Sequence, residues 1–474
     1  MKKLLLLVAI VATLSANVFA SINDPSKALS LKEGSTKPYK SNSRFEPTFE
    51  FSTNPVSLVD NFYDYFPGSY TGSPMQRVDN SAIGGINGNW IVYHTKTTAN
   101  GNRRVYKAFV DATGAVSTNT AFGTNDIWEG YAGVAVTEGG RPMFAYHVNM
   151  DGDADLEVGF GYDALLGGTV MEMHSSLEII IDNMTTLEVN GTVYDQNEFI
   201  WPSVQIADSP VAGSQRMYVM GKNASTVGSA VSENVFIVYK DFTDADIENQ
   251  VFDGTGWGST TIPMLDNWNV STGEWRRPYM AFIAHEDKIY YAGYHIAYTE
   301  SGEEAVQLDE PTTDVFICDN YGEGTWVQNS IYSSFNSYNP NYINPTGDHE
   351  GEEMATEYFT DVADDELIYG IGQSGHFNAS MDNIGRINFS AFYTLKTTTG
   401  SYYPGLHIVK NISFDTNTLE WQVSDVYPQG PNSVVDVTGN TTSGTPADVV
   451  TWMAWDMDAD GLHDEILDDG TWDG

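Results

Sequence analysis

The sequence predicts an all-β fold, a six-bladed β-propeller of four-stranded antiparallel blades, with seven blades as the alternative. Short runs rich in Val, Ile, Tyr and Phe are separated by Gly, Asn, Asp and Thr clusters, and no long stretch has a helical period. Repeated all-strand units form such arrays because one unit alone cannot bury both of its faces. A pair of ordinary β-sandwiches is the competing architecture. The repeated unit starts near Ala82, Tyr131, Trp201, Arg277, Met354 and Val449.

Each unit is expected to contain strands in a fixed order. The start of the first strand is marked by an aromatic residue or a Pro, as in Gly140–Tyr146, Trp201–Ala207 and Arg277–Ala284. Second strands are expected at 217–220, 289–293 and 367–371. Third strands run into Asp at 105–111, 235–241, 315–319 and 406–415, and Trp257, Trp326 and Trp421 follow.

The N-terminal segment predicts export. Residues 1–20 form a signal peptide, because a basic start and the apolar run 4–14 precede a small-residue cleavage pattern at 18–20. The apolar run is too short to span a bilayer, so the mature chain has no predicted transmembrane segment. The expected location is extracellular, at the cell surface or periplasmic. Residues 21–60 are interpreted as a linker or strap, and 61–474 as the propeller, whose last blade is expected to be truncated.

Composition excludes several classes of partner. The 474 residues are 41% hydrophobic, which is enough for a large layered core. Cys318 is the only cysteine, so no internal disulfide can form; it lies in an apolar strand and is expected to be buried. The net charge of −42 would repel nucleic acid and anionic membranes.

Two acidic clusters suggest structural calcium sites. Alternating oxygen side chains on a Gly-containing loop can converge on Ca²⁺, which takes six to eight oxygens. A solvated Asp-rich turn is the alternative for each. Flanked by strands, the clusters resemble the calcium loops of integrin-type (FG-GAP) propellers. The expected ligands are Asp456, Asp458, Asp460, Leu462 through its carbonyl, and Asp464 in one loop, and Asn149, Asp151, Asp153 and Asp155 in the other.

The turns that join Asp to a following Trp, at Asp319–Trp326 and Asp469–Trp472, resemble the Asp-boxes of the sialidase (BNR) propeller superfamily. The resemblance implies a propeller in which Asp and Gly shape a turn and the Trp packs beneath it. Sialidases also carry an Arg-Ile-Pro motif, three carboxylate-binding Arg and a Tyr–Glu nucleophile pair. This sequence has no Arg-Ile-Pro, so no catalytic set is transferred.

A binding face is predicted where loops lead into the first strands, since these loops share one face of a propeller. Trp faces stack on sugar rings, and carboxylate pairs are what glycoside hydrolysis requires. The alternative is that the Trp residues cover the core. The candidate ligand-binding residues are Trp128, Trp201, Trp275, Arg277, Glu198 and Glu353.

These patterns leave two function classes. The main prediction is a calcium-stabilised propeller that binds a carbohydrate or a cell-surface protein without chemistry. The alternative is a secreted sialidase-like glycoside hydrolase or lyase.

Overall fold

The computed structural model describes part of the chain between residues 57 and 427. The described residues are 57–59, 62, 74–79, 85–122, 127–150, 156–164, 178–183, 187–189, 192–194, 198–223, 231–232, 234–267, 269–270, 279–298, 306–330, 367–371, 379–397 and 402–427. The predicted signal peptide, most of the predicted linker and the Asp456 loop lie outside them. Within them, no helix has both the length and the apolar character needed to cross a membrane.

Five antiparallel sheets of four or five strands dominate the described fold. The first is β1 (Met75–Asp79), β2 (Asn87–Thr95), β3 (Arg104–Asp111) and β4 (Val116–Ala121). The second is β5 (Glu129–Val136), β6 (Pro142–Val148), β7 (Glu157–Tyr162) and β8 (Glu178–Ile181). The third is β11 (Phe199–Asp208), β12 (Gln215–Asn223), β14 (Val235–Phe242) and β15 (Gly258–Thr261).

The fourth and fifth sheets continue the same order. The fourth is β17 (Tyr279–His285), β18 (Lys288–Tyr298), β19 (Val306–Cys318) and β20 (Trp326–Ser330). The fifth is β21 (Leu367–Ile371), β23 (Arg386–Thr397), β24 (Tyr402–Asp415) and β25 (Glu420–Tyr427), with β22 (Ala379–Met381) also on β23. Smaller elements are the ribbons β9 (Leu187–Val189) with β10 (Thr192–Tyr194) and β13 (Val231–Ser232) with β16 (Asn269–Val270), the helix α3 (Asp244–Glu248), and the 3₁₀ turns η2 (Pro263–Asn267) and η3 (Asn320–Gly322).

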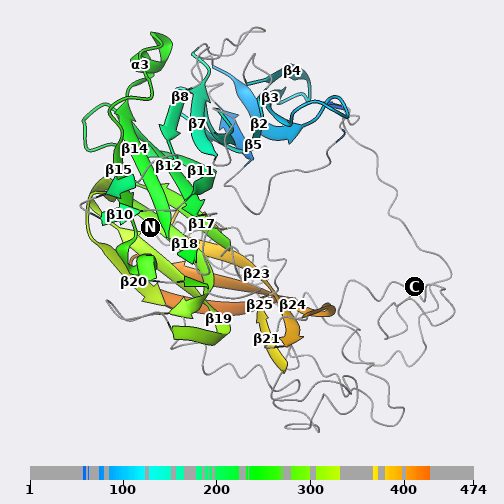
Figure 1. The fold of residues 1–474 in the computed structure, drawn as a ribbon, viewed down its shortest axis with the longest axis vertical. Helices are drawn as coiled ribbons and strands as arrows, with labels where there is room; N and C mark the ends of the chain where they lie inside the picture. The colour runs from blue at the N-terminus through cyan, green and yellow to red at the C-terminus, as the bar shows by residue number, and fades with distance from the viewer. Residues whose placement is uncertain are drawn as a thin grey trace, which may run out of the picture.

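The first strands β5, β11 and β17 lie at the contacts between the first four sheets (Figure 1). The strand β5 packs against β2 and β11, and β11 packs in turn against β17. Apolar side chains fill the gaps between the first and second, the second and third, and the third and fourth sheets. Trp90, Phe109 and Phe144 belong to the layer between the first two sheets, and Tyr218, Phe282 and Phe316 to the layer between the third and fourth.

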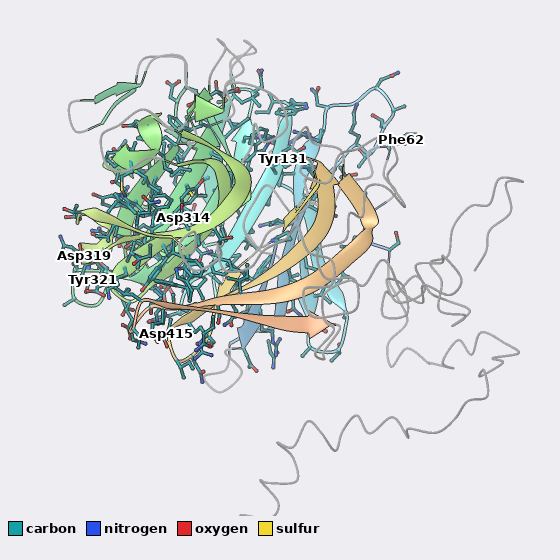
Figure 2. All side chains as sticks on the ribbon, turned by 90° about the horizontal axis from the view of Figure 1, so that it is seen from below. Phe62, Tyr131, Asp314, Asp319, Tyr321 and Asp415 are labelled. Atoms are coloured by element: carbon teal, nitrogen blue, oxygen red, sulfur yellow. The ribbon has the colours of Figure 1, made fainter. Side chains whose placement is uncertain are left out.

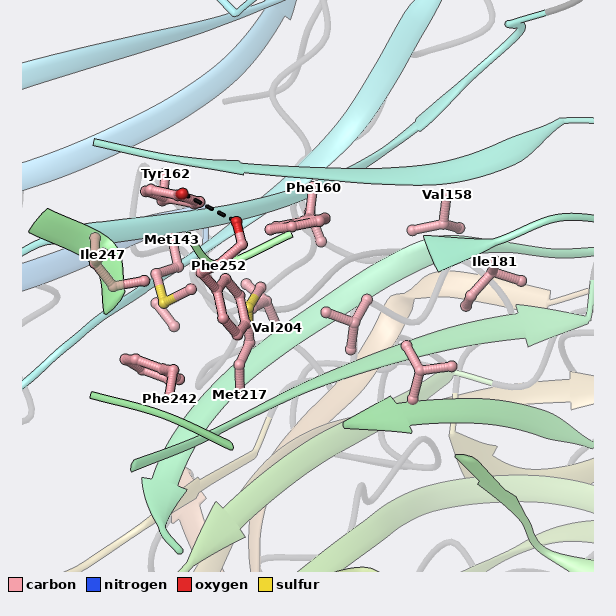
Figure 3. Close-up of a cluster of buried hydrophobic side chains, with 14 of the residues drawn as sticks. Met143, Val158, Phe160, Tyr162, Ile181, Val204, Met217, Phe242, Ile247 and Phe252 are labelled. Carbon is pink, nitrogen blue, oxygen red and sulfur yellow. Dashed lines mark hydrogen bonds between the residues drawn. The ribbon is translucent and has the colours of Figure 1, made fainter. Parts of the chain in front are cut away.

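The layer between the second and third sheets shows how these cores are closed (Figure 3). Met143, Phe160 and Met217 are completely or almost completely buried there. Phe252, which follows α3, enters the same layer and packs edge-to-face on Phe160. The Tyr162 hydroxyl donates to the Phe252 carbonyl at 2.9 Å, so the one polar atom that this ring brings into the layer is satisfied.

The observed sheets confirm the all-β class and the four-stranded antiparallel unit. The starts at Tyr131 and Trp201 fall in the first strands β5 and β11 as predicted. The start at Ala82 is wrong, because the first strand β1 ends before it, at Asp79. Six or seven blades are not confirmed, since the described residues form five larger sheets, and Met354 and Val449 lie outside them.

Two strand assignments also need correction. The segment Gly140–Tyr146, expected to lead a sheet, contributes to β6, the second strand of its sheet. The segment 367–371, expected as a second strand, is β21, which pairs with β23 alone. Apolar content identifies a strand, but position within a sheet depends on partners that are distant in sequence.

The Asp residues at strand ends shape tight turns. Asp111 Oδ1 accepts hydrogen bonds from Thr113 N at 2.8 Å and Ala115 N at 3.0 Å, and Asp415 serves the turn after β24 in the same way. Trp257 Nε1 donates to the carbonyl of Asp253 at 3.1 Å. The bonds to the Asp111 and Asp415 carboxylates form local Asx turns of the kind that Asp favours.

Cys318, at the end of β19, is fully buried among apolar neighbours, as predicted. Burial raises the pKa of its thiol to about 11.

Candidate functional site

The first strands β5 and β11 carry the same irregularity near their starts. The pairing register shifts between Gly130 and Gly133 in β5, and between Ile200 and Ser203 in β11. Within these bulges Tyr131 and Trp201 adopt left-handed backbone conformations, with φ of 50° and 51°. Such conformations are unfavourable for bulky side chains and cluster at functional sites. Two sheets therefore keep a strained aromatic residue at matching positions.

Around these two residues lies a group that we call the leading-end cluster, because it sits where the first strands begin. The Arg103 guanidinium lies 3.9 Å from the Trp128 ring centroid and 4.9 Å from that of Tyr131. The Tyr131 ring in turn meets the His147 ring at 4.9 Å and the Trp201 ring at 6.4 Å. The cluster consists of Arg103, Trp128, Tyr131, His147 and Trp201.

Hydrogen bonds lock Arg103 in place. Its Nε donates to the carbonyl of Glu129 at 2.9 Å, and its Nη2 lies 3.0 Å from His147 Nε2. Because a guanidinium can only donate, His147 Nε2 must accept, and its hydrogen is on Nδ1. Burial, then the charge of Arg103, holds the pKa of His147 far below its usual value, so the ring is neutral.

His94, on β2, completes the setting of Tyr131. Its Nδ1 accepts a hydrogen bond from the Tyr131 amide at 3.0 Å, which satisfies the backbone at the strained position. Burial, with a smaller effect of Arg103, lowers the pKa of His94 to about 3. Both imidazoles are thus neutral at physiological pH and act as hydrogen-bonding groups rather than cations.

Three carboxylates lie close to the cluster. Glu129 is buried and accepts from Arg104 Nε at 3.2 Å and from the Val105 amide at 2.9 Å. Glu157 is also buried and accepts from the Met150 amide at 2.8 Å. Glu198 is only partly buried, and its Oε1 accepts from the Leu156 amide at 3.0 Å. Of the three, Glu198 is the one with access to solvent.

The backbone that carries Glu198 is fixed on both sides. The Glu198 amide donates to Asn223 Oδ1 at 3.3 Å. At the next residue, Asn183 exchanges two hydrogen bonds with the Phe199 backbone, each at 3.0 Å. A carboxylate on a rigid strand start is held more accurately than one on a long loop.

The structure brings some of the predicted binding residues together. Trp128 and Trp201 both lie in the leading-end cluster, and Leu156, which donates to Glu198, packs against Trp201. Trp201 is only 7% exposed, so its ring is part of the packing, whereas Trp128 is partly exposed. Trp275, Arg277 and Glu353 lie outside the described residues.

Most of the predicted calcium ligands lie outside the described residues. Asn149 follows β6, and its amide donates to the Trp128 carbonyl at 3.0 Å. Asp151, Asp153, Asp155 and the whole Asp456 loop are outside the described residues. In the described part of the chain, no group of three His, Cys, Asp or Glu side chains is arranged to hold a metal ion.

Sequence reasoning missed a basic residue that recurs on the second strand of successive sheets. The register places His147 opposite Gly130 and Lys222 opposite Ile200, so the two occupy equivalent positions, one residue before each bulge. Tyr93-His94 on β2 matches Tyr146-His147. The signal was present as the dipeptides Tyr-His, Tyr-His, Gly-Lys and Tyr-His at 93–94, 146–147, 221–222 and 294–295.

Comparison with known proteins gives distant structural likenesses. No family model matches the chain, and no curated protein does. An α-L-arabinanase of Cellvibrio cellulosa is 11% identical, covering 76% of this chain and 96% of its own, with a TM-score of 0.30. A β-1,3-galactosidase of glycoside hydrolase family 43 is 8% identical, covering 76% and 95%, with a TM-score of 0.33. A protein of unknown function from Dyadobacter fermentans is 10% identical, covering 65% and 72%, at 0.32.

These likenesses do not confirm the sialidase or FG-GAP resemblance. They contradict the main functional prediction, a non-catalytic binding protein, because several of the similar structures are glycoside hydrolases. The alternative prediction fits them better. They assign neither a substrate nor a site to this chain.

Proposed function

We propose that this chain is a glycoside hydrolase whose active site lies at the leading end of β5 and β11. The observation that carries the proposal is the pair of left-handed aromatic residues, Tyr131 and Trp201, at matching bulges beside a partly exposed carboxylate, Glu198. Each such backbone conformation costs about 1–3 kcal/mol, and bulges beside active sites serve to aim side chains. Structural needs alone would be met by glycine at either position.

The leading-end cluster also supplies what a sugar site requires. Partly exposed Trp128 offers aromatic surface beside the hydrogen-bonding groups of Arg103 and His147. Pyranose rings are recognised by this combination of apolar face and polar edge. Buried Glu129 has both a cationic and a backbone partner, so its role is to position Arg104 and β3 rather than to react.

Hydrolysis of a glycosidic bond needs two carboxyl groups on opposite sides of the scissile bond. Glu198 is the proposed first member, since it is held by Leu156 and retains access to solvent. Glu353, which lies outside the described residues, is the proposed second, because its predicted place is also a loop leading into a first strand. Their separation would decide whether anomeric configuration is inverted or retained.

The test is a hydrolysis screen on defined oligosaccharides with wild type, Glu198→Gln and Glu138→Gln. Glu138 is an exposed residue of the hairpin between β5 and β6, far along the strands from Glu198, and its change should leave the rate unchanged. Loss of one carboxyl of a pair should lower kcat by at least about 100-fold, the usual contribution of general acid–base catalysis. Full activity of Glu198→Gln with a native circular dichroism spectrum would refute the assignment.

Structural calcium stays part of the proposal. Asp456, Asp458, Asp460, the Leu462 carbonyl and Asp464 would supply oxygen ligands in one loop, and Asn149 with its three Asp neighbours in the other. A ligand that binds only the folded state at ~100 Kd adds about 2.7 kcal/mol. Melting in calcium and in chelator tests this, and identical melting temperatures would exclude a structural ion.

We further propose that six blades, or seven, complete the array, with the start at Val449 leading the last one. The turns at Asp253 and Asp319 support a relation to Asp-box propellers, because each places a Trp against the core after an Asp turn. Export through residues 1–20 is consistent with a hydrolase that meets its polymer outside the cell. N-terminal sequencing of the exported protein would test the cleavage after Ala20.

A further inference from the structure

Lys222 differs from four other buried cations of the described residues because they have polar partners and it has none there. Arg103 bonds the Glu129 carbonyl, Lys107 pairs with Asp163, Arg141 with Glu248, and Arg216 with Asp241. Lys222 is only 7% exposed, and within the described residues it has no hydrogen-bond or ion-pair partner. The described residues thus leave its ammonium without a counter-charge, in contrast to Lys107, Arg141 and Arg216.

The position of Lys222 places it beside the leading-end cluster. On β12 it stands opposite Ile200, and residues directly opposite in an antiparallel pair project from the same face. Ile200 packs with Trp201 and Tyr131. The ammonium group therefore belongs to the neighbourhood of the leading-end cluster, one strand inward from the strained Trp201.

The equivalent residue of the neighbouring sheet points to the same chemistry. His147 is buried, and its Nδ1, which carries the hydrogen, has no hydrogen-bond partner in the described part of the chain. Two matching positions of adjacent sheets thus present hydrogen-bond donors: a neutral N–H at His147 and a cation at Lys222. The one acceptor among them, His147 Nε2, is already occupied by Arg103.

We propose that Lys222, assisted by the His147 Nδ1–H, binds an anionic substituent of the sugar, a carboxylate or a sulfate, so that the substrate is an acidic glycan. That the bound glycan is a substrate rests on the proposed hydrolase function. The binding of an anionic glycan does not depend on hydrolysis. A single ammonium is a point charge that does not select between a planar carboxylate and a tetrahedral sulfate.

Two further properties of the protein agree. Burial alone lowers the pKa of Lys222 to about 8, so the amine is still mostly protonated at neutral pH and would gain a full charge partner from an anion. The net charge of −42 repels polyanions at long range, so nonspecific attraction to the surface cannot mimic the site. At 0.15 M salt that repulsion is screened beyond about 8 Å, while a buried contact is not.

The experiment measures binding calorimetrically with three probes: de-esterified oligogalacturonate, the same oligomer fully methyl-esterified, and a sulfated galactan oligosaccharide. The protein is the full mature chain as wild type, Lys222→Met, Lys222→Arg and Lys288→Met. Lys288 lies at the hairpin between β17 and β18, the opposite end of that sheet from the first-strand starts, and serves as the control.

The expected result is that wild type binds at least one anionic probe ~10-fold or more tightly than the ester, a difference equal to about 1.4 kcal/mol. Lys222→Met should abolish this preference, while Lys222→Arg and Lys288→Met should keep it, at both 0.15 and 0.5 M salt. Lys222→Met should also raise the melting temperature of the unliganded protein, which removal of a structural lysine would not do. Preference for the sulfated probe alone identifies the anion as sulfate.

Equal affinity of wild type for the acid and its ester, or binding of none of the probes, would overturn the inference. So would a preference that survives Lys222→Met. Should Lys222→Met not fold, Lys222→Gln replaces it, and the wild-type ratio of acid to ester decides by itself. Hydrolysis of neutral and acidic glycans at equal rates would leave the hydrolase standing without this inference. Anion binding that depends on Lys222, without any hydrolysis, would support this inference and contradict the hydrolase.

Discussion

The leading-end cluster and the hairpin turns satisfy their polar groups in opposite ways. At the turn after β3, Asp111 bonds residues two and four positions away. In the cluster, the Tyr131 amide uses His94, 37 positions away, and Arg103 reaches His147, 44 positions away. Figure 2 shows Tyr131 well apart from Asp319 and Asp415. One region forms from local sequence, whereas the other exists only after sheets have assembled.

The largest expected effect comes from cutting a polar link between sheets. Lys107 on β3 pairs with Asp163, just after β7, and both side chains are almost fully buried. Lys107→Met leaves Asp163 without its cation, and breaking a buried pair on one side costs about 3–5 kcal/mol. Urea unfolding of the purified protein measures the loss.

The matched control for this change is the double variant Lys107→Met with Asp163→Leu. Because an apolar pair of similar volume avoids the desolvation of both charges, it should regain most of the lost stability or exceed wild type. If the single variant lost no more stability than a typical surface change, the pair would not link the two sheets as described.

A smaller effect is expected inside the leading-end cluster. Arg103→Lys keeps the charge but removes the planar group that faces Trp128 and Tyr131 and the Nε bond to Glu129. The loss should be roughly 1–3 kcal/mol, because a stacked guanidinium with two hydrogen bonds is not replaced by an ammonium. The exposed residue Arg77 offers the same substitution as a control, with a change within about 0.5 kcal/mol. Equal effects at both positions would show that the stacking contributes little.

The smallest expected effects concern how stability depends on pH. Asp111 in a hairpin turn and Asp163 between two sheets should contribute with opposite signs. Hydrogen bonds from the Thr113 side chain, then the Ala115 and Thr113 amides, lower the pKa of Asp111. The contribution of Asp111 to stability is therefore present above about pH 3.8, the pKa of the unfolded chain. It is lost as pH falls through the lowered pKa of the folded state. Burial, partly offset by Lys107, raises the pKa of Asp163 to about 6.

For Asp163 the sign is reversed. The folded protein binds more protons than the unfolded chain between about 3.8 and about 6, so its contribution is present below that window and is lost as pH rises through it. Unfolding of wild type, Asp111→Asn and Asp163→Asn from pH 3 to 8 measures both differences. Parallel pH curves for the two variants would contradict the distinction between the regions.

The sequence was sufficient wherever structure depends on near neighbours. The strands β3 and β14 were predicted within a residue of their observed ends, and the Asp turns that close such strands use only adjacent amides. The failures concern partners far along the chain. The pairing of β21 and the place of β1 depend on which strand arrives beside them, and periodicity carries no such information.

The candidate site shows the same limit. Trp128, Trp201 and Glu198 were found because loops before first strands share a face in a propeller. Arg103 was not singled out, since nothing in the sequence distinguishes it from Arg104, yet the first is buried and the second partly exposed. The recurrent Tyr-His and Gly-Lys dipeptides would have revealed the second-strand basic positions, had they been aligned on the repeat.

The buried thiol of Cys318 has a consequence for the redox behaviour of the protein. With its pKa near 11, almost none of it is thiolate at neutral pH, and no atom of a second cysteine exists to bridge it. Thiolate is the species that exchanges with disulfides and reacts with oxidants. The thiol of the folded chain therefore exchanges slowly with disulfides, in oxidising as in reducing surroundings.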